Sequence, residues 1–410
     1  MSRTPTRVLL FTGKGGVGKT SVAAATAVRA AARGARVLVT STDPAHSLAD
    51  ALDRPLGDAA TSIELATGGA LAAQQIDAQQ RLERHWREVR DYLVTLLSWG
   101  GVGEVQAEEL VLLPGLDELF ALIDLRAQVR SGRYDLVVVD CAPTAETLRL
   151  LSLPDALRWY VDRVLGPGRR IARAMRPLSR ARGAAGLPVP EDDVFGAVDR
   201  VHADLAAVHE LLQDPARSSV RLVVNAERLV VAETQRTATA LSLFGYGIDA
   251  VVVNRLLPDA ITDPYLARWK QRQAGHLATV RAAFEPTPVL TSPLFDDELD
   301  GVQGLARLGD AVYGDLDETA VLDDSRPVTI VTDGDDQILR LSLPFTAKDD
   351  VDLHRRGPDL HLAVAGVRRT VSLPAALQRR EVGGARFVDG HLEVRFVTVA
   401  DPVPSPVASP

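Results

Sequence analysis

Apolar residues occur in short, almost unbroken runs that are separated by longer stretches of mixed character. The runs cover residues 7–12, 36–42, 134–140, 220–225 and 250–254. An unbroken apolar run is typical of a strand buried on both faces, as in a parallel sheet covered by helices. The pattern therefore predicts an α/β domain built on a parallel sheet.

Two stretches of this domain have the spacing of one-sided amphipathic helices. The first, residues 78–113, has apolar side chains from Leu82 to Leu96 at intervals of 3 and 4. The second, residues 155–214, begins with many arginines and has the same spacing from Val194 to Leu212. We expect helical insertions in a domain spanning residues 1–320. Their apolar faces either pack on the sheet and each other or form a groove for an apolar partner.

The pattern changes to strict alternation after Arg326. Leu339, Leu341 and Leu343 alternate with polar or outward positions, and similar runs follow, separated by Gly and Asp-Gly turn signals. This predicts a separate β-sandwich over residues 326–398. Residues 400–410 are rich in Pro, Ser and Val and are expected to be a disordered tail.

Composition narrows the class of protein. With 410 residues and a net charge of −8, the chain is long enough for two units and does not favour nucleic-acid binding. The single cysteine, Cys141, excludes an internal disulfide and a structural zinc site and indicates a reducing compartment. No apolar stretch reaches the roughly 18 residues that span a bilayer. We expect a soluble, cytoplasmic protein with at most transient membrane contact.

A glycine-rich segment between the first strand and an Ala-rich helix has the spacing of a P-loop. Its residues are Gly13, Lys14, Gly15, Gly16, Val17, Gly18, Lys19 and Thr20, with Ser21 next at the start of the helix. Glycines let the backbone wrap around phosphate oxygens, and the N–H groups of the loop and helix form an anion site. The segment predicts ATP binding, with Lys19 reaching the phosphates and Thr20 offering its hydroxyl to Mg²⁺. The alternative, a glycine-rich turn without a ligand, leaves the match of both spacing and flanking elements unexplained.

Lys14 is a second, unusual lysine of the loop. A lysine at this position could be a solvated surface charge. Between two glycines at a phosphate cradle, however, its charge is better assigned to a phosphate, and its reach beyond its own loop suggests the nucleotide of a partner subunit. Lys14 therefore predicts a homodimer and is a candidate catalytic residue with Lys19.

Two aspartates follow strands of the predicted sheet. Asp43 can orient a water molecule for attack on the γ-phosphate and is also a candidate magnesium ligand. Asp140 ends the strand at 134–140 and is placed like a Walker-B carboxylate, which with Thr20 would hold Mg²⁺. Either aspartate alone could be a helix cap or turn residue. His46 could contact phosphate or fix its own loop by a hydrogen bond.

At these residues the sequence resembles the arsenical-pump and tail-anchored-protein-targeting ATPases, a family of deviant P-loop ATPases that share the extra lysine. The motifs that carry the resemblance, over residues 5–315, are the P-loop, Asp43-Pro44-Ala45-His46-Ser47-Leu48, Pro114-Gly115-Leu116-Asp117-Glu118, and Asp140-Cys141-Ala142-Pro143-Thr144 with Thr147-Leu148-Arg149. The resemblance implies Lys14 as the intersubunit lysine, Asp43 as the water-activating residue and Asn254 as an adenine contact. Asn254 could instead be a strand-end cap.

The chain departs from the family at four points. Ala145-Glu146 stands where the family usually has Gly-His. The CxxC zinc clasp of the targeting factors is missing, so no zinc is expected. One cysteine cannot form the multi-thiol metalloid site of the arsenite pumps, and two methionines cannot form a methionine-rich groove for a client protein.

The C-terminal segment resembles the α-crystallin domain of small heat-shock proteins. Residues 339–345, 359–366, 368–374 and 385–392 carry this likeness. It implies a compact β-sandwich whose edges suit pairing or peptide capture; the alternative is a structural cap.

These observations favour a Mg²⁺-dependent ATPase working as a homodimer that opens and closes to bind and release an apolar helix or an unfolded segment of a client protein. The alternatives are a regulatory or scaffold ATPase without such a client, and a metalloid pump subunit.

Overall fold

The computed structural model describes residues 5–43, 47–76, 116–160, 203–204 and 206–398. The predicted insertion at 78–113 and the tail at 400–410 lie outside these residues, as does most of the insertion at 155–214. Two compact units are present. The first comprises Met1–Thr237 with Gly247–Ser325, and the second comprises Ala238–Tyr246 with Arg326–Pro410.

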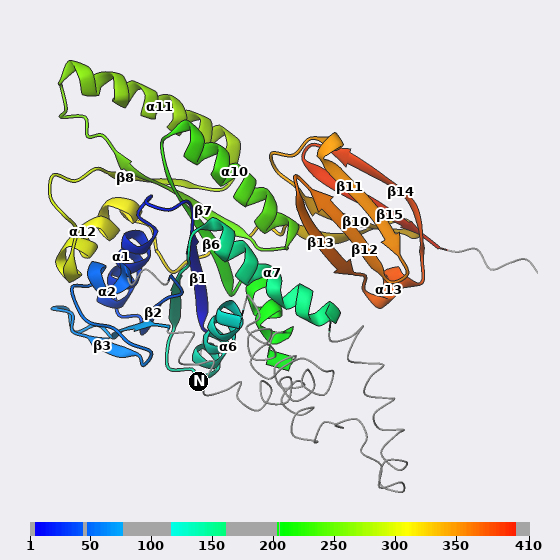
Figure 1. Cartoon of the computed structure of the whole chain (residues 1–410), viewed down its shortest axis with the longest axis horizontal. Helices are drawn as coiled ribbons and strands as arrows, with labels where there is room; N and C mark the ends of the chain where they lie inside the picture. Colours follow the sequence, from blue (N-terminus) through cyan, green and yellow to red (C-terminus); the bar gives the residue numbers. More distant parts are fainter. Residues whose placement is uncertain (1–4, 44–46, 77–115, 161–202, 205, 399–410) are drawn as a thin grey trace, which may run out of the picture. The chain divides into compact units, whose positions relative to one another are not determined.

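An eight-stranded sheet with the order β3-β4-β2-β5-β1-β6-β7-β8 forms the centre of the first unit (Figure 1). Its strands are β1 (Arg7–Thr12), β2 (Val37–Ser41), β3 (Thr61–Ile63), β4 (Leu71–Gln75), β5 (Leu136–Asp140), β6 (Ser218–Asn225), β7 (Ile248–Leu256) and β8 (Val289–Pro293). All neighbouring strands are parallel except β3, which pairs antiparallel with β4. The unbroken Val and Leu runs of β1, β2 and β5 are fully buried, which confirms the predicted α/β class.

Helices cover both faces of this sheet. They are α1 (Lys19–Ala32), α2 (Ser47–Ala51), α6 (Leu116–Arg130), α7 (Thr144–Tyr160), α10 (Arg228–Leu243), α11 (Pro264–Phe284) and α12 (Gly301–Tyr313). Figure 1 shows α1 and α12 on one face and α6 and α7 on the other. The small side chains of α1 allow close packing, and ten of its residues are buried. None of the described helices has the length and apolar character needed to cross a membrane.

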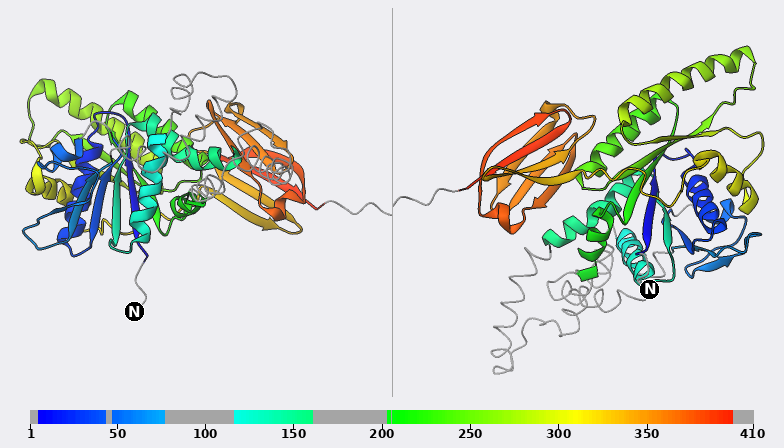
Figure 2. Two further views of the ribbon diagram at one scale, coloured as in Figure 1. Left: turned by 60° about the horizontal axis from the view of Figure 1, so that its bottom comes forward. Right: turned by 180° about the vertical axis from the view of Figure 1, so that it is seen from behind.

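The second unit consists of two antiparallel sheets (Figure 2). The four-stranded sheet has the order β14-β15-β10-β9, and the three-stranded sheet has the order β11-β12-β13. The elements are β9 (Val328–Asp333), β10 (Asp336–Ser342), η2 (Lys348–Asp350), β11 (Val351–Arg356), β12 (Asp359–Val364), β13 (Val367–Ser372), α13 (Ala375–Gln378), β14 (Glu381–Val388) and β15 (His391–Val397). The predicted all-β class is confirmed.

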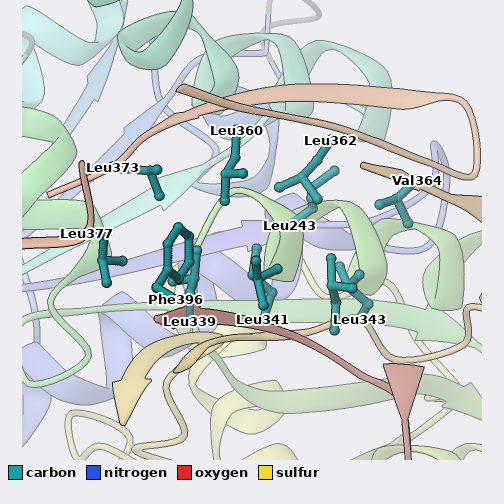
Figure 3. Close-up of a cluster of buried hydrophobic side chains, with 12 residues drawn as sticks. Leu243, Leu339, Leu341, Leu343, Leu360, Leu362, Val364, Leu373, Leu377 and Phe396 are labelled. Carbon is teal, nitrogen blue, oxygen red and sulfur yellow. The ribbon is translucent and has the colours of Figure 1, made fainter. Parts of the chain in front are cut away.

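Alternating leucines build the core of this unit. Leu339, Leu341 and Leu343 are buried, as their spacing predicts, and face Leu360 and Leu362 of β12 (Figure 3). The end of α10 belongs to the same core. Leu243 is completely buried there, and its carbonyl accepts a hydrogen bond from the Arg369 guanidinium.

Candidate functional site

Three parallel strands bring the site residues together at one edge of the sheet. β5 lies between β2 and β1, and the register places Asp140 beside both Ser41 and Phe11. The P-loop follows β1 directly, so the ends of β1, β2 and β5 converge where α1 begins. The carboxyl ends of parallel strands are where open α/β sheets bind ligands.

Two glycines of the P-loop lie where the surrounding atoms leave no room for a Cβ. A Cβ at Gly13 would lie 2.2 Å from the Val223 carbonyl oxygen. Gly18 has φ 91° and forms the N-cap of α1, and a Cβ there would lie 2.4 Å from the Asn254 amide nitrogen. The loop is therefore a tightly supported backbone cradle whose N–H groups can surround phosphate.

Asn254 and Arg255, at the end of β7, hold this loop. Asn254 Nδ2 donates to the Val17 carbonyl at 2.9 Å, and Asn254 Oδ1 accepts from the Arg255 N–H at 3.0 Å. Arg255 Nη1 donates to the Gly16 carbonyl at 3.0 Å. The side chain of Asn254 thus braces the P-loop, a role that its position at a strand end did not reveal. Its contact with adenine stays a prediction.

The two lysines of the P-loop point to different partners. Lys19 is buried, and its Nζ lies 3.4 Å from the Lys14 carbonyl oxygen. Lys14 is partly exposed, and its Nζ lies 3.5 Å from Glu233 Oε2 on α10. Lys19 is directed into its own loop, whereas Lys14 is directed away from it.

Asp140 is a completely buried carboxylate beside the P-loop. Ser41 Oγ donates to Asp140 Oδ2 at 3.0 Å, while Asp140 Oδ1 has no hydrogen-bond partner in the described part of the chain. Burial raises the pKa of Asp140 from about 3.8 to about 6, and the nearby hydroxyls of Thr20 and Ser41 and the charge of Lys19 offset part of this rise. A buried carboxylate oxygen without a partner, next to a threonine hydroxyl, suits a hard divalent cation such as Mg²⁺.

Asp43 is held through its backbone by two polar side chains from adjacent strands. Its N–H donates to Ser41 Oγ at 3.2 Å, and its carbonyl accepts from Gln75 Nε2 at 2.9 Å. Ser41 therefore contacts both aspartates of the site. Neither Ser41 nor Gln75 was predicted as a site residue; the sequence signal that marks them is a polar residue at the buried end of a strand.

Other predicted residues have simpler positions or are not described. Cys141 is completely buried, and burial raises the pKa of its thiol. Ser21 lies in the first turn of α1. Residues 44–46, with His46, and residues 114–115 lie outside the described part of the chain.

Comparison with known proteins assigns the chain to a family. The family described as anion-transporting ATPase matches residues 6–314, and the HSP20-like domain found in that family matches residues 334–396. The chain belongs to this ATPase family. It is an ATPase with a C-terminal HSP20-like domain, as the resemblance of the P-loop, the strand-end aspartates and the β-sandwich indicated.

Two of the named relatives of this ATPase match almost its whole length, and a third matches about three quarters of it. A putative arsenical pump-driving ATPase of Chlorobaculum tepidum is 39% identical over 391 residues, covering 95% of this chain and 96% of the relative. Another putative arsenical pump-driving ATPase, from Aquifex aeolicus, is 32% identical over 92% of this chain and 96% of the relative. ATPase get3 of Schizosaccharomyces pombe is 27% identical over 74% of this chain and 90% of the relative.

Proposed function

We propose that this ATPase works as a homodimer that uses Mg²⁺ and ATP to close and hydrolysis to open, and that this cycle binds and releases an apolar client protein in the cytoplasm. One observation carries the nucleotide part of the proposal. Three separate segments converge at the carboxyl edge of the sheet: the P-loop with Lys19 and Thr20, the end of β2 with Asp43, and the end of β5 with Asp140.

Each side chain has a part in binding or in moving a proton. The loop N–H groups and Lys19 would hold the phosphates, because Lys19 is the buried cation of the cradle. Thr20 and Asp140 would hold Mg²⁺, either directly or through water, with Asp43 close by. The bound magnesium would neutralise charge on the phosphate oxygens. Asp43, held through its backbone by Ser41 and Gln75, would orient the attacking water and accept its proton.

Lys14 supports the homodimer. Its side chain is 40% exposed and does not enter the cradle of its own loop, where Lys19 already lies. A lysine has a flexible four-carbon stem and a compact charge, so it can reach a phosphate across an interface. We infer that Lys14 contacts the nucleotide of the partner subunit, and that two nucleotides at the interface favour the closed dimer.

The apolar client is the less direct part of the proposal. Relatives are named both as arsenical pump-driving ATPases and as get3. The whole sequence contains one cysteine, so one subunit cannot provide the several thiols of a metalloid site. This favours a protein client over a metalloid. The HSP20-like domain adds exposed β-edges, which can pair with extended peptide. The second candidate is a regulatory ATPase without an apolar client.

A binding experiment separates these functions. The Asp43→Asn variant should bind Mg²⁺-ATP without hydrolysing it, and Lys19→Ala should serve as the variant with weakened nucleotide binding. A fluorescent peptide with an apolar helix of about 20 residues is the probe, and a peptide of equal length with interspersed lysines is its control. Apolar-peptide binding by Asp43→Asn in Mg²⁺-ATP, absent from Lys19→Ala and from the control peptide, supports the client. Equal binding in all cases, or none, favours the regulatory ATPase.

A further inference from the structure

Lys14 has an acidic partner within its own subunit. Its Nζ lies 3.5 Å from Glu233 Oε2, and the two side chains are 40% and 30% exposed. Glu233 lies on α10, which begins after β6, so its carboxylate reaches the P-loop from a different part of the fold. The roles proposed for the P-loop and the strand-end aspartates do not require a carboxylate at Glu233.

We propose that Glu233 is a positioning residue for Lys14, which it holds in the free subunit and must release before Lys14 can bind the partner's nucleotide. This inference rests on the proposed homodimer and on the role of Lys14 in it. It gives the ATPase a competition between two anions for one ammonium group: a carboxylate of the same subunit and the phosphates of the other.

The geometry separates the two lysines of the loop. The Lys14 carbonyl receives Lys19 Nζ at 3.4 Å, while the Lys14 side chain extends to α10. Lys19 is 6% exposed and stays in the cradle. The Glu233 carboxylate thus keeps the second positive charge away from the subunit's own phosphate site and at a defined position on the surface.

The ion pair is weak enough to exchange. A partly exposed pair at 3.5 Å, longer than the usual charge-assisted hydrogen bond of about 2.8 Å, contributes little and is screened by salt. A triphosphate has several negative charges, and closure of an interface removes water and strengthens its attraction for Lys14. The nucleotide of a partner subunit should therefore displace Glu233, and Glu233 should raise the protein concentration needed for dimerisation.

Sedimentation of the full-length chain tests this competition. The measurement compares Asp43→Asn with Asp43→Asn/Glu233→Gln, each in saturating Mg²⁺-ATP, over a range of protein concentrations. Loss of the carboxylate should lower the dimer dissociation constant about two- to fivefold, the range of an exposed ion pair, and the difference should shrink at high salt. Glu233→Asp should restore the original constant in large part, because it keeps the charge.

Two further variants test whether the effect comes specifically from the ion pair of Lys14 with Glu233. Glu227 is exposed just before α10 and is not the partner of Lys14, so Glu227→Gln removes the same charge and should leave dimerisation unchanged. In a Lys14→Ala background, Glu233→Gln should have no effect, since the partner is gone. Matching thermal melting curves would show that all the variants are folded.

The outcomes distinguish the two proposals. If Asp43→Asn remains monomeric in Mg²⁺-ATP, or dimerises equally well without Lys14, the proposed homodimer fails and the inference with it. If dimerisation requires both ATP and Lys14, but Glu233→Gln dimerises with unchanged or weaker affinity, the homodimer stands and the role of Glu233 is wrong.

Discussion

The side-chain amide of Gln75 donates a hydrogen bond of 2.9 Å to the backbone carbonyl of Asp43. Gln75 is the last residue of β4 and is 3% exposed. Ser41, at the end of the adjacent strand β2, accepts the Asp43 N–H on the other side. Two buried side chains thus fix the backbone that carries the proposed water-orienting carboxylate.

Replacing Gln75 should impair hydrolysis more than binding. Gln75→Ala removes the donor to the Asp43 carbonyl, so the carboxylate loses its fixed position while the P-loop is unchanged. We expect kcat to fall about tenfold or more, because small displacements of catalytic groups are costly, with ATP affinity close to that of the unsubstituted chain. Steady-state ATPase assays and nucleotide titrations measure the two quantities separately.

Gln74 is the matched control for this substitution. It precedes Gln75 in β4 and is equally buried, but its Nε2 donates to the Asp58 carbonyl and to Asp124 Oδ2, away from the site. Gln74→Ala should cost about 1 to 3 kcal/mol of stability, as lost buried hydrogen bonds do, and retain kcat. Equal losses of kcat in both variants would show that the effect of Gln75 is structural only.

Asp140 makes the free energy of unfolding of the nucleotide-free protein depend on pH. Burial raises the pKa of its carboxyl to about 6, above the ordinary value near 3.8. The folded state therefore binds the proton more tightly than the unfolded chain, so protonation stabilises the fold. This contribution grows as pH falls from about 7 through 6 to about 4, and above pH 6 the buried carboxylate lowers stability.

Asp140→Asn should remove the destabilisation caused by the buried carboxylate without changing the size of the side chain. At pH 8 and without Mg²⁺ or nucleotide, the variant should be more stable than the unsubstituted protein by about 2 to 3 kcal/mol, and the difference should vanish toward pH 4. Urea unfolding at several pH values measures it. A difference that does not depend on pH would contradict the assignment. Saturating Mg²⁺-ATP should stabilise the unsubstituted chain more than the variant.

The part of the fold that the sequence predicted is the part with a strong periodic signal. Unbroken Val and Leu runs marked β1, β2 and β5, and alternating leucines marked β10. β4, with the sequence LAAQQ, gave no such signal, because its buried glutamines bond to distant groups rather than repeat with a period. The edge strands β9 and β14 were missed because most of their side chains are exposed.

The site was predictable where a motif fixes backbone spacing and not where a side chain depends on the fold. The P-loop and the strand-end position of Asp140 follow from local sequence. The contacts of Asn254 with the P-loop and of Glu233 with Lys14 join segments far apart in the chain, and no spacing rule encodes them. These contacts form only because β7 and α10 pack beside the P-loop in the folded chain.

Gly18 should be intolerant of alanine even without nucleotide. Its φ of 91° disfavours any L side chain, and a Cβ would lie 2.4 Å from Asn254 Nδ2, which would break the bond to Val17. Gly18→Ala should lose about 1 to 3 kcal/mol of stability and most of its nucleotide affinity. Gly15→Ala, where a Cβ meets open space, should keep the stability of the free protein. Thermal melting of both free variants makes this comparison, and equal melting temperatures would contradict it.

The opposite end of the sheet depends on a buried charge cluster centred on Asp249. Arg7 Nη2 donates to Asp249 Oδ2 at 3.0 Å, and Arg221 Nε donates to Asp249 Oδ1 at 3.0 Å. Arg221 also donates to the hydroxyl of Tyr313 and to the Glu318 carbonyl, which attaches the segment after α12 to the sheet. Burial alone would lower the pKa of Arg221, but the neighbouring Tyr313 and Asp249 raise it, so the guanidinium stays charged.

Asp249→Asn should therefore be among the most damaging substitutions outside the nucleotide site. It leaves two buried guanidinium groups without their shared counter-charge, and breaking a buried ion pair from one side costs about 3 to 5 kcal/mol. Because arginine keeps its proton, the loss should be the same from about pH 6 to pH 9. Asp310→Asn, which breaks the ion pair of Arg29 with a carboxylate that is 73% exposed, should cost less than about 1 kcal/mol. Urea unfolding of the nucleotide-free variants ranks the two, and similar costs would mean that water reaches the Asp249 cluster and screens it as it does a surface pair.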